Sequence, residues 1–588
     1  MLRLFLTSLL VFSLHIRLGH SERCRCIPSA PCWPTAAQWS TFNNTISGKL
    51  VRNVPIAAPC YPGVYQDATK CAAVTSSWTD TSFRSQFPIG YAYPYTESCD
   101  LPGGNTTACA LGDSPVFAVN ATTSADVIAG LKFAKEKNLR LVVKMTGHDL
   151  LGRSTGYGSL EIWLRHLRQG VNFEKTYVPT PSYNQRTTPL WTGSAIEVNG
   201  GYSWSDVYKV AVANKVIVVG GGCPDVGAIG GYMQGGGHSP ASRDFGLGAD
   251  QLLEAQVVLT NGQKVLASPT ENSDLFRALR GGGGGTYGIV TSAKIKAYPD
   301  SRYTSQALYL APLNASADAL AALMEAVAIV YEAFPVLNDG GLSGYGTWTS
   351  YSIPNTLNAS LSYSLGAKGK TIQEVQALFQ PTLEKLRVYN GTALNIVVSY
   401  ATYASYWDYY SSTSGVNSAA SANTALVSRL FTKDNLSKGA ALRKMLNTTA
   451  GTAYEGTVNG FCLVSGGAVF NSSDPFSGVN PVWRKSYAYQ YTARGWLDTA
   501  DYSTVAAVHH DITYQKGGAL REFAPDTGVY MSESDWQDPY YLQDFYGSEL
   551  PVLQAAKLKY DPGSVLYCPT CVGSEEWAVT SNGSLCKV

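Results

Sequence analysis

The sequence predicts an α+β protein that is divided into at least two domains. A chain of 588 residues is too long for a single compact core. Two segments with the apolar spacing of a helix are each followed by an apolar strand. The second half of the chain contains further segments with helical spacing and segments in which apolar and polar residues alternate as in strands. The predicted helices are 125–136, 204–215, 317–334 and 371–389, and the predicted strands are 139–145, 216–222, 361–367, 395–401 and 485–492.

The order of these elements follows from local signals. ADVIAGLKFAKE (125–136) has helical spacing after a Thr-Ser cap, and LRLVVKM then gives a buried strand. TPLWTGSAIEVNGGY (188–202) contains strand pieces with turn signals, WSDVYKVAVANK (204–215) is a helix, and VIVVGGG (216–222) is a strand. Each of the two predicted strands therefore ends in a glycine-rich turn.

The N-terminus predicts export. Residues 1–21 contain Arg3, an apolar run (4–14) and small residues at the end, which is the layout of a secretory signal peptide. The apolar run is about half of the ~20 residues that a membrane span needs. No later segment is a candidate span, so we expect a soluble, extracellular protein.

Glycosylation and composition agree with this compartment. We expect N-linked glycans on part of a set of N-x-S/T sequons, which are Asn43, Asn105, Asn120, Asn314, Asn358, Asn390, Asn435, Asn447, Asn471 and Asn582. The net charge is only +1 and charged residues make up 15% of the chain, which argues against nucleic acid or an acidic membrane as partner. The 37 tyrosines suggest aromatic surfaces of the kind that line small-molecule pockets.

The twelve cysteines fall mostly at the two ends of the chain. They are Cys24, Cys26, Cys32, Cys60, Cys71, Cys99 and Cys109 in a region of little periodicity (22–110), Cys568, Cys571 and Cys586 in the tail, and Cys223 and Cys462 between them. We expect disulfides that brace an N-terminal extension and the C-terminal tail. The CPTC sequence at 568–571 lacks a second ligand pair, so we expect no metal site. If Cys223 has another use, eleven cysteines remain and one of them must be free, with Cys462 as a candidate.

Glycine-rich loops follow the predicted strands. TGHDLLGRSTGYGS (146–159) and VVGGGCPDVGAIGGYMQGGGHSP (218–240) would bring backbone N–H groups and bare backbone close to a flat or charged ligand. A nicotinamide-binding fold would place its glycines in the first βα unit, and GGGGGTYG (281–288) lacks the Lys-Ser/Thr ending of a P-loop. Glycine-rich turns of an ordinary secreted β-rich domain remain the alternative.

Five stretches together resemble the berberine bridge enzyme-like branch of the FAD-linked oxidases, which have the vanillyl-alcohol-oxidase fold. They are TGHD (146–149), GGGCPDVGAIGGYMQGGG (220–237), FGLGADQLLEAQVVLTNGQ (245–263), ENSDLFRALRGGGGGTYGIVTSAKIKAYP (271–299), and the tail with YMSESDW (530–536) and KYDPGSVLYCPTCVGSEEW (559–577). The resemblance implies an FAD-binding domain at 111–299, a substrate domain at 300–525 with an antiparallel sheet covered by helices, and a segment at 526–588 that returns to the FAD domain.

The resemblance also implies a bicovalent FAD. In the family, a histidine in the first loop bonds the flavin 8α-methyl and a cysteine in the second bonds C6, and His148 and Cys223 match these positions. Imidazole and thiolate are both good nucleophiles, and a cysteine outside the disulfide clusters is available to react. The remaining residues expected to bind the cofactor are Met145, Thr146, Gly147, Asp149, Val226, Gly227, Gly230, Gly231, Gly236, Gly237, Gly288 and Ile289.

Candidate catalytic residues come from the tail and from one strand. Glu533 matches the family position of a catalytic tyrosine or glutamate, and we expect burial beside the flavin to raise its pKa toward neutrality. Tyr489 and Tyr491 alternate along 485–492 with Tyr487 and would bind substrate, or act as base if their pKa is lowered. His509 and His510, expected in a turn before a strand, are weaker candidates for the base.

Other positions bear on the reaction. Val226 falls at the family's oxygen-gating position, and a valine there is typical of an oxidase that gives hydrogen peroxide. Ser532 and Leu150 depart from the family's usual Asn and from the Tyr of carbohydrate-oxidising relatives. We therefore expect an oxidase of an alcohol or hemiacetal carbon in a small organic substrate, with O2 as acceptor. The alternatives are oxidative cyclisation or desaturation in secondary metabolism, and a flavin-carrying extracellular protein with little turnover.

Overall fold

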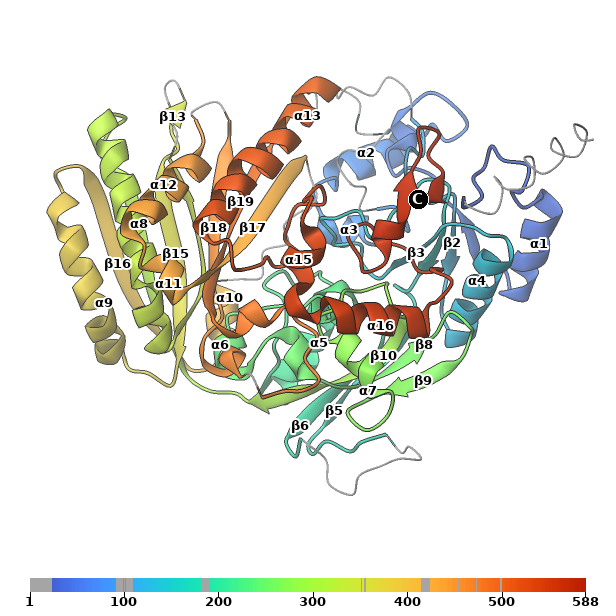
Figure 1. Ribbon diagram of the computed structural model, residues 1–588, viewed down its shortest axis with the longest axis horizontal. Coiled ribbons are helices and arrows are strands. Elements are labelled where there is room, and N and C mark those ends of the chain that lie inside the picture. The colour runs from blue at the N-terminus through green and yellow to red at the C-terminus, as the bar shows by residue number, and fades with distance from the viewer. Residues whose placement is uncertain are drawn as a thin grey trace, which may run out of the picture.

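The computed structural model describes residues 24–90, 99, 101, 109–180, 191–350, 352–353, 356–413, 423–452, 455–471, 473–497 and 500–588. The signal peptide expected at 1–21 and the sequon at Asn105 lie outside these residues. The three largest sheets have four, six and seven strands, and helices accompany each of them (Figure 1). The predicted α+β class is confirmed.

The four-stranded sheet consists of the first four strands of the described chain. Its order is β1-β2-β4-β3, with β2, β4 and β3 parallel and β1 antiparallel to β2. Helix α4 begins after Thr123, whose hydroxyl accepts from the N–H of Asp126 while the Asp126 carboxylate accepts from the N–H of Thr123, which is the capping box that a Thr-Ser start favours. The bounds are β1 Leu50–Arg52, β2 Phe117–Asn120, α4 Ser124–Glu136, β3 Leu141–Lys144 and β4 Leu160–Trp163.

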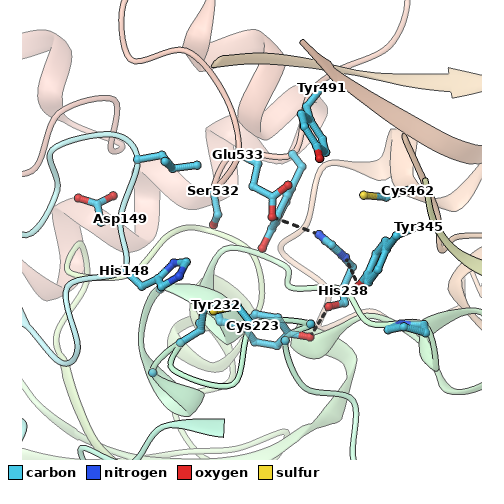
Figure 2. A pocket seen from close by; sticks show the side chains of 18 of the residues that line it. His148, Asp149, Cys223, Tyr232, His238, Tyr345, Cys462, Tyr491, Ser532 and Glu533 are labelled. Carbon is cyan, nitrogen blue, oxygen red and sulfur yellow. Dashed lines mark hydrogen bonds and ion pairs between the residues drawn. The ribbon is translucent and has the colours of Figure 1, made fainter. Parts of the chain in front are cut away.

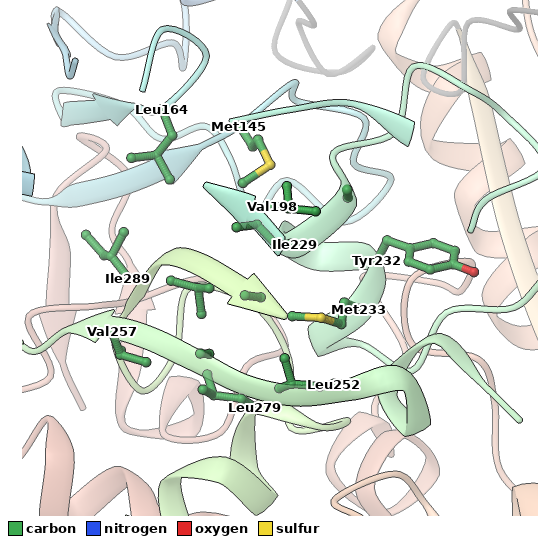
Figure 3. Packing of buried hydrophobic residues seen from close by; sticks show 14 of the residues in the cluster. Met145, Leu164, Val198, Ile229, Tyr232, Met233, Leu252, Val257, Leu279 and Ile289 are labelled. Carbon is green, nitrogen blue, oxygen red and sulfur yellow. The ribbon is translucent and has the colours of Figure 1, made fainter. Parts of the chain in front are cut away.

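The six-stranded sheet has the order β5-β6-β10-β8-β9, and β7 pairs with β10. Met145, Ile229, Leu252, Leu279 and Ile289 belong to the apolar core around this sheet (Figure 3). The bounds are β5 Arg168–Glu174, β6 Ser194–Gly200, α5 Trp204–Ala213, β7 Val216–Ile217, α6 Ser242–Phe245, β8 Leu252–Val258, β9 Lys264–Ala267, α7 Ser273–Leu279 and β10 Ile289–Pro299.

The strand predicted at 216–222 is shorter than expected. It ends at Ile217, and the glycines that follow pack against α5 instead of pairing. A Cβ at Gly220 would lie 2.5 Å from the Trp204 ring and from the Tyr208 hydroxyl, so only a bare backbone can approach this helix so closely. The loop that carries Cys223 therefore starts on the surface of α5.

The seven-stranded sheet forms the other side of the molecule in Figure 1. Its order is β16-β11-β15-β12-β18-β19-β17, and every pair is antiparallel. Alternation sets its two faces: Leu308 and Leu310 are buried under helices, whereas Tyr309 between them is 43% exposed on the opposite face. The strands are β11 Tyr303–Pro312, β12 Leu342–Thr349, β15 Ser360–Lys368, β16 Leu394–Tyr403, β17 Thr424–Thr432, β18 Thr457–Leu463 and β19 Ser486–Gly495.

The longer helices cover one face of this sheet, and the shorter α10 Tyr406–Thr413 packs against the other face, where a Cβ at Gly366 would lie 2.5 Å from the Tyr409 ring. Those in contact with the apolar cluster are α8 Ala317–Asp339, α9 Ile372–Leu386, α12 Gly439–Ala450 and α14 Gly517–Phe523. Helix α8 was predicted to end at Phe334, yet it continues through Pro335. Phe334 and Leu337 are fully buried, and this packing compensates for the backbone hydrogen bond that a proline cannot make.

Helix α8 is also long and apolar enough, by length and composition, to cross a membrane, and it is the one such helix among the described residues. We expected no candidate after the N-terminal run. Val327, Val330 and Tyr331 are fully buried in the core of the sheet, so burial inside the domain explains the apolar composition of α8.

The two ends of the described chain lie beside the four-stranded sheet, where Cys26 forms a β-bridge with Leu139 and Leu566 forms one with Leu141. The remaining elements are α1 Ala36–Thr45, α2 Ala68–Ser76, α3 Thr81–Arg84, α10 Tyr406–Thr413, α11 Lys433–Leu436, α13 Tyr502–His510, α15 Tyr541–Tyr546, α16 Leu550–Tyr560, and the short strands β13 Ser352–Ile353, β14 Thr356–Leu357, β20 Trp577–Val579 and β21 Leu585–Lys587. Lys557 on α16 donates to the carbonyl of Thr286 at 3.0 Å. The tail thus packs onto the segment that joins α7 to β10.

The predicted disulfides are present at both ends. The pairs are Cys24–Cys586, Cys26–Cys32, Cys60–Cys71, Cys99–Cys109 and Cys568–Cys571. Cys223 and Cys462 remain thiols, and the described residues contain no cluster that could hold a metal ion. The first pair joins the two ends of the described chain, which sequence spacing did not reveal.

One sequon is a poor glycan acceptor. Asn435 is buried, and its side-chain carbonyl accepts from the N–H of Thr432 at 2.9 Å. Asn435 completes the capping box of α11, whose N-cap is Thr432, so its amide is not accessible to a glycosylating enzyme. Exposed sequons include Asn314, Asn447 and Asn582, which remain candidates.

Candidate active site

A cavity of about 1100 Å³ lies between the six-stranded sheet and the seven-stranded sheet. Its walls are three glycine-rich loops, the face of the large sheet opposite the longer helices, α10 and the turn at 530–533. The lining residues used below are Met145–Asp149, Gly221–Cys223, Val226–Gly227, Ile229–Gly231, Gln234, Gly284–Gly285, Gly288–Ile289, Tyr345, Tyr491, Ser532 and Glu533.

The first loop carries His148. It leaves β3 at Met145 and turns at Gly147, whose φ of +87° favours glycine. The Asp149 carboxylate accepts from the backbone N–H groups of Leu151 at 3.1 Å and Ser154 at 3.1 Å. Asp149 lines the cavity, but its carboxylate accepts hydrogen bonds from the backbone of the turn that follows His148 and so stabilises that turn.

The second loop carries Cys223 and is held by three neighbours. The N–H of Trp204 donates to the carbonyl of Val226 at 2.9 Å, and the N–H of Ser205 donates to the carbonyl of Pro224 at 2.8 Å. From the large sheet's side, the Tyr410 hydroxyl on α10 donates to the carbonyl of Gly222 at 2.9 Å. These contacts place the Cys223 thiol in the cavity wall, and Figure 2 shows it turned toward the same space as His148, Ser532 and Glu533.

The predicted glycines have different roles. A Cβ at Gly227 would lie 2.8 Å from the Met145 sulfur, so this glycine lets the first two loops touch. A Cβ at Gly231 or at Gly285 would meet nothing within 4 Å, because both face open space. Gly236 and Gly237 do not line the cavity; Gly237 lies behind Tyr232, whose ring would be 2.6 Å from a Cβ there.

A hydrogen-bonded cluster stands opposite the loops. The Tyr489 hydroxyl donates to the Glu533 carboxylate at 2.6 Å and lies 2.7 Å from Nε2 of His238. His238 Nε2 is also 3.5 Å from the second Glu533 oxygen, and its Nδ1 is 3.0 Å from the Tyr345 hydroxyl. Tyr489 has one hydroxyl proton, which it donates to Glu533. In the contact between Tyr489 and His238, Nε2 of His238 is therefore assigned as the donor and the Tyr489 oxygen as the acceptor.

The cluster lowers the pKa of Glu533. Burial would raise this pKa, but the hydrogen bond and charge interaction with His238 and the hydrogen bond from Tyr489 outweigh burial. The expected raised pKa is therefore wrong. The Glu533 side chain is 33% exposed because it faces the cavity, so an ionised carboxylate is open to a ligand.

The tyrosines do not fit the role of a base. Burial raises the pKa of Tyr489 and of Tyr491 well above the usual phenol value, and nearby Cys462 and Glu533 raise it further. Tyr491 lines the cavity, whereas Tyr489 lies behind Glu533 and is fully buried. The Tyr487 hydroxyl donates a hydrogen bond to the Asp339 carboxylate at 3.2 Å, and Tyr487 does not line the cavity.

Two other sequence candidates lie elsewhere. His509 and His510 end helix α13, so the expected turn before a strand is wrong, and neither lines the cavity. His238, by contrast, was overlooked although it directly follows the run Gly235–Gly237. The sequence signal that could have identified His238 is its position directly after a glycine run in a loop expected to bind a ligand.

The loops have the features that FAD requires. Gly231 and Gly285 leave open space along their backbones, which lets a flat cofactor lie against them. Among the described residues, the buried side-chain oxygens of Gln234 and Ser532 have no hydrogen-bond partner, although both residues line the cavity. A polar ligand in the cavity would satisfy them, because buried polar groups are rarely left unpaired.

Comparisons with known proteins agree with this site. Residues 115–268 match the family described as an FAD binding domain. The chain is 44% identical over 577 residues to the FAD-linked oxidoreductase hmp9 of Hypomyces subiculosus, covering 96% of this chain and 91% of that protein. The crystal structure of the VAO-type flavoprotein MtVAO713 from Myceliophthora thermophila C1 superposes with a TM-score of 0.91 at 42% identity, over 96% of this chain and all of that one.

A more distant structure shares only the fold. The glucooligosaccharide oxidase from Acremonium strictum, described with a 6-S-cysteinyl, 8α-N1-histidyl FAD, is 17% identical to this chain with a TM-score of 0.59. It covers 78% of this chain, and 92% of its own length is matched.

Proposed function

We propose a specific activity for this chain, which belongs to the family of FAD-linked oxidoreductases with the vanillyl-alcohol-oxidase fold. It is a secreted, glycosylated oxidase that removes hydride from an alcohol or hemiacetal carbon of a small organic molecule, with O2 as acceptor. The main support is that one cavity is walled by His148 and Cys223 on one side and by the ionised Glu533 on the other. The five disulfides support an oxidising compartment.

His148 and Cys223 would hold the cofactor covalently. The Cys223 loop is held by α5 and α10, and the His148 loop is held by the hydrogen bonds that Asp149 accepts from Leu151 and Ser154. Gly231, Gly285 and Gly288 supply bare backbone for the cofactor to lie against. When bound, FAD supplies hydride acceptance from the substrate and reaction with oxygen to give hydrogen peroxide.

Glu533 would take the proton of the substrate hydroxyl. A base must be within hydrogen-bond reach of that proton and in its proton-free form, and the cavity-facing Glu533 carboxylate has a lowered pKa. Tyr489 holds one carboxylate oxygen at 2.6 Å, which leaves the other oxygen for substrate. His238 would favour the ionised carboxylate before proton transfer.

The substrate would be uncharged. Among the described lining residues of the large sheet and α10, hydroxyl, thiol, aromatic and apolar side chains occur but no charged ones. They include Ser305, Thr347, Ser362, Ser364, Ser399, Tyr345 and Tyr491. Because an unpaired buried charge is costly, an anion or cation would find no partner on this wall, and Glu533 would repel an anion.

A peroxide assay tests this function. The purified protein is offered a panel of neutral alcohols, sugars and phenolic alcohols together with matched carboxylic acids, with Glu533→Gln as the control for the active site. We expect peroxide from at least one neutral class and at least tenfold less from its acid counterpart. Peroxide from acids alone, or equal rates in the variant, would contradict the proposal.

The tyrosine-rich wall supports a second candidate. Tyr345, Phe461 and Tyr491 line the cavity and could stack on a flat ring, which suits oxidative cyclisation or desaturation of an unsaturated metabolite. Product analysis separates the two reactions, since alcohol oxidation creates a carbonyl group and cyclisation or desaturation creates a new ring or C=C bond. No turnover on either class would leave the third alternative, a flavin-carrying protein.

A further inference from the structure

The N-terminal segment, residues 24–90, contacts the loop that carries Cys223 and the strand that precedes the His148 loop. We propose that this disulfide-braced segment is a positioning element for cofactor attachment: it fixes the Cys223 loop through Asp225 and the strand before His148 through Lys144. The inference rests on the covalent FAD proposed above. None of its residues lines the cavity among the described residues, so the segment would act only through other residues.

Asp225 is the first tether. It lies two residues after Cys223 and its side chain is buried. Its two carboxylate oxygens accept from the hydroxyls of Thr81 and Ser82 on α3, the latter at 3.1 Å. Thr81 is fully buried, so this contact is shielded from water. The N-terminal segment thus holds the middle of the loop, while α5 holds the backbone on either side of Asp225.

Lys144 is the second tether. It is the last residue of β3, directly before Met145 and the His148 loop, and it is 2% exposed. Its ammonium group donates to the carbonyl of Pro88. The turn that contains Pro88 is itself closed by Arg84, whose guanidinium donates to the carbonyl of Gly90 at 2.7 Å. Thr81 and Pro88 therefore belong to one short stretch that contacts both the Cys223 loop and the strand before the His148 loop.

Disulfides and aromatic packing anchor the N-terminal segment to the rest of the protein. Cys60–Cys71 closes a loop before α3, and Cys24–Cys586 fixes the start of the segment to the tail. Trp39 packs against Phe117 and Phe133, with ring centroids 4.3 and 4.9 Å apart. A reacting pair must be held to within about 1 Å, since a misplacement of this size can cost about 100-fold in rate. A loosened Cys223 loop would therefore lose its bond to the cofactor first.

The test removes the two hydroxyls that hold Asp225. In the Thr81→Val/Ser82→Ala variant, we expect hydrogen exchange of peptides spanning 219–230 to be at least tenfold faster, because local opening becomes easier. Thr382→Val on α9 removes a buried hydroxyl far from the loops and should leave this exchange unchanged. Thr81→Ser alone retains the hydroxyl and should behave like the native protein. Unchanged exchange in the double variant would overturn the proposal.

Peptide mass analysis gives a second readout that general destabilisation would not produce. We expect at least fivefold more Cys223 in alkylatable form in the double variant, while attachment at His148 is kept. A faster-exchanging loop with undiminished Cys223 attachment would overturn the positioning role. If the native protein has no flavin on Cys223, the proposed attachment fails, whereas the exchange experiment still decides whether the segment fixes the loop.

Discussion

Replacing Glu533 by glutamine tests the proposed base with little change in shape. The side-chain amide oxygen that Glu533→Gln introduces can still accept the hydrogen bond that Tyr489 donates at 2.6 Å, but an amide cannot take up the substrate proton. Positioned proton transfer contributes about 100–10,000-fold, which corresponds to about 2.7–5.4 kcal/mol at 1.36 kcal/mol per decade. We expect substrate-driven flavin reduction to slow by at least 100-fold, with substrate affinity changed less than about threefold.

Anaerobic stopped-flow reduction, with the substrate identified by the peroxide panel, measures this rate directly. Because the pKa of Glu533 is lowered, the native rate should be constant down to the usual titration range of a glutamate and fall only in more acidic buffer, as the carboxylate is protonated. The variant should lack this acidic limb. Glu522→Gln, at a 68% exposed side chain on α14, is the matched control. A reduction rate within fivefold of the native rate, or an unchanged acidic limb, would refute the assignment.

Three further changes test the structure around the site. Asp250→Asn breaks a buried, two-bond ion pair with Arg484, at 2.7 and 2.8 Å, that joins the six-stranded and seven-stranded sheets, and calorimetry should show a loss of about 3–5 kcal/mol; a loss under about 1 kcal/mol would argue against this link. Glu161 is fully buried, and burial raises its pKa to about 8 from a usual 4.5. Between these two pKa values the native state binds one more proton than the unfolded state, so the protein loses stability as the pH rises. In Glu161→Gln this loss is removed, and the fall in Tm from pH 5 to 7.5 should become shallower. A Tm that falls with pH as steeply as in the native protein would contradict the raised pKa of Glu161. Tyr491→Phe should raise KM by about two- to tenfold with kcat retained if this phenol only binds substrate, and a kcat loss above 100-fold would show a chemical role.

Much of one cavity wall could be predicted from local sequence. Strand-to-glycine transitions identified the loops of His148 and Cys223, because the backbone path of each loop depends on glycines close to these residues in sequence. The separation of Cys223 from the clustered cysteines also followed from position alone. These features depend on a few adjacent residues, which a sequence shows directly.

The electrostatics of the site could not be predicted in the same way. His238 and Glu533 come from distant parts of the chain and meet only after the tail folds back, so the expected rise in the pKa of Glu533 omitted the group that lowers it. Gly237 matched a motif, yet the structure uses it to pack against Tyr232. The role of the N-terminal segment likewise depends on a contact between Thr81 and Asp225 that no local pattern indicates.

The most direct test of the central claim is mass analysis of the protein's own flavin. The purified protein is precipitated with acid and digested, and the peptides that contain His148 and Cys223 are examined. We predict that the yellow colour stays with the precipitate and that one flavin joins the two peptides. Release of all colour into the supernatant, with both peptides recovered unmodified and Cys223 alkylated, would contradict covalent attachment and the function built on it.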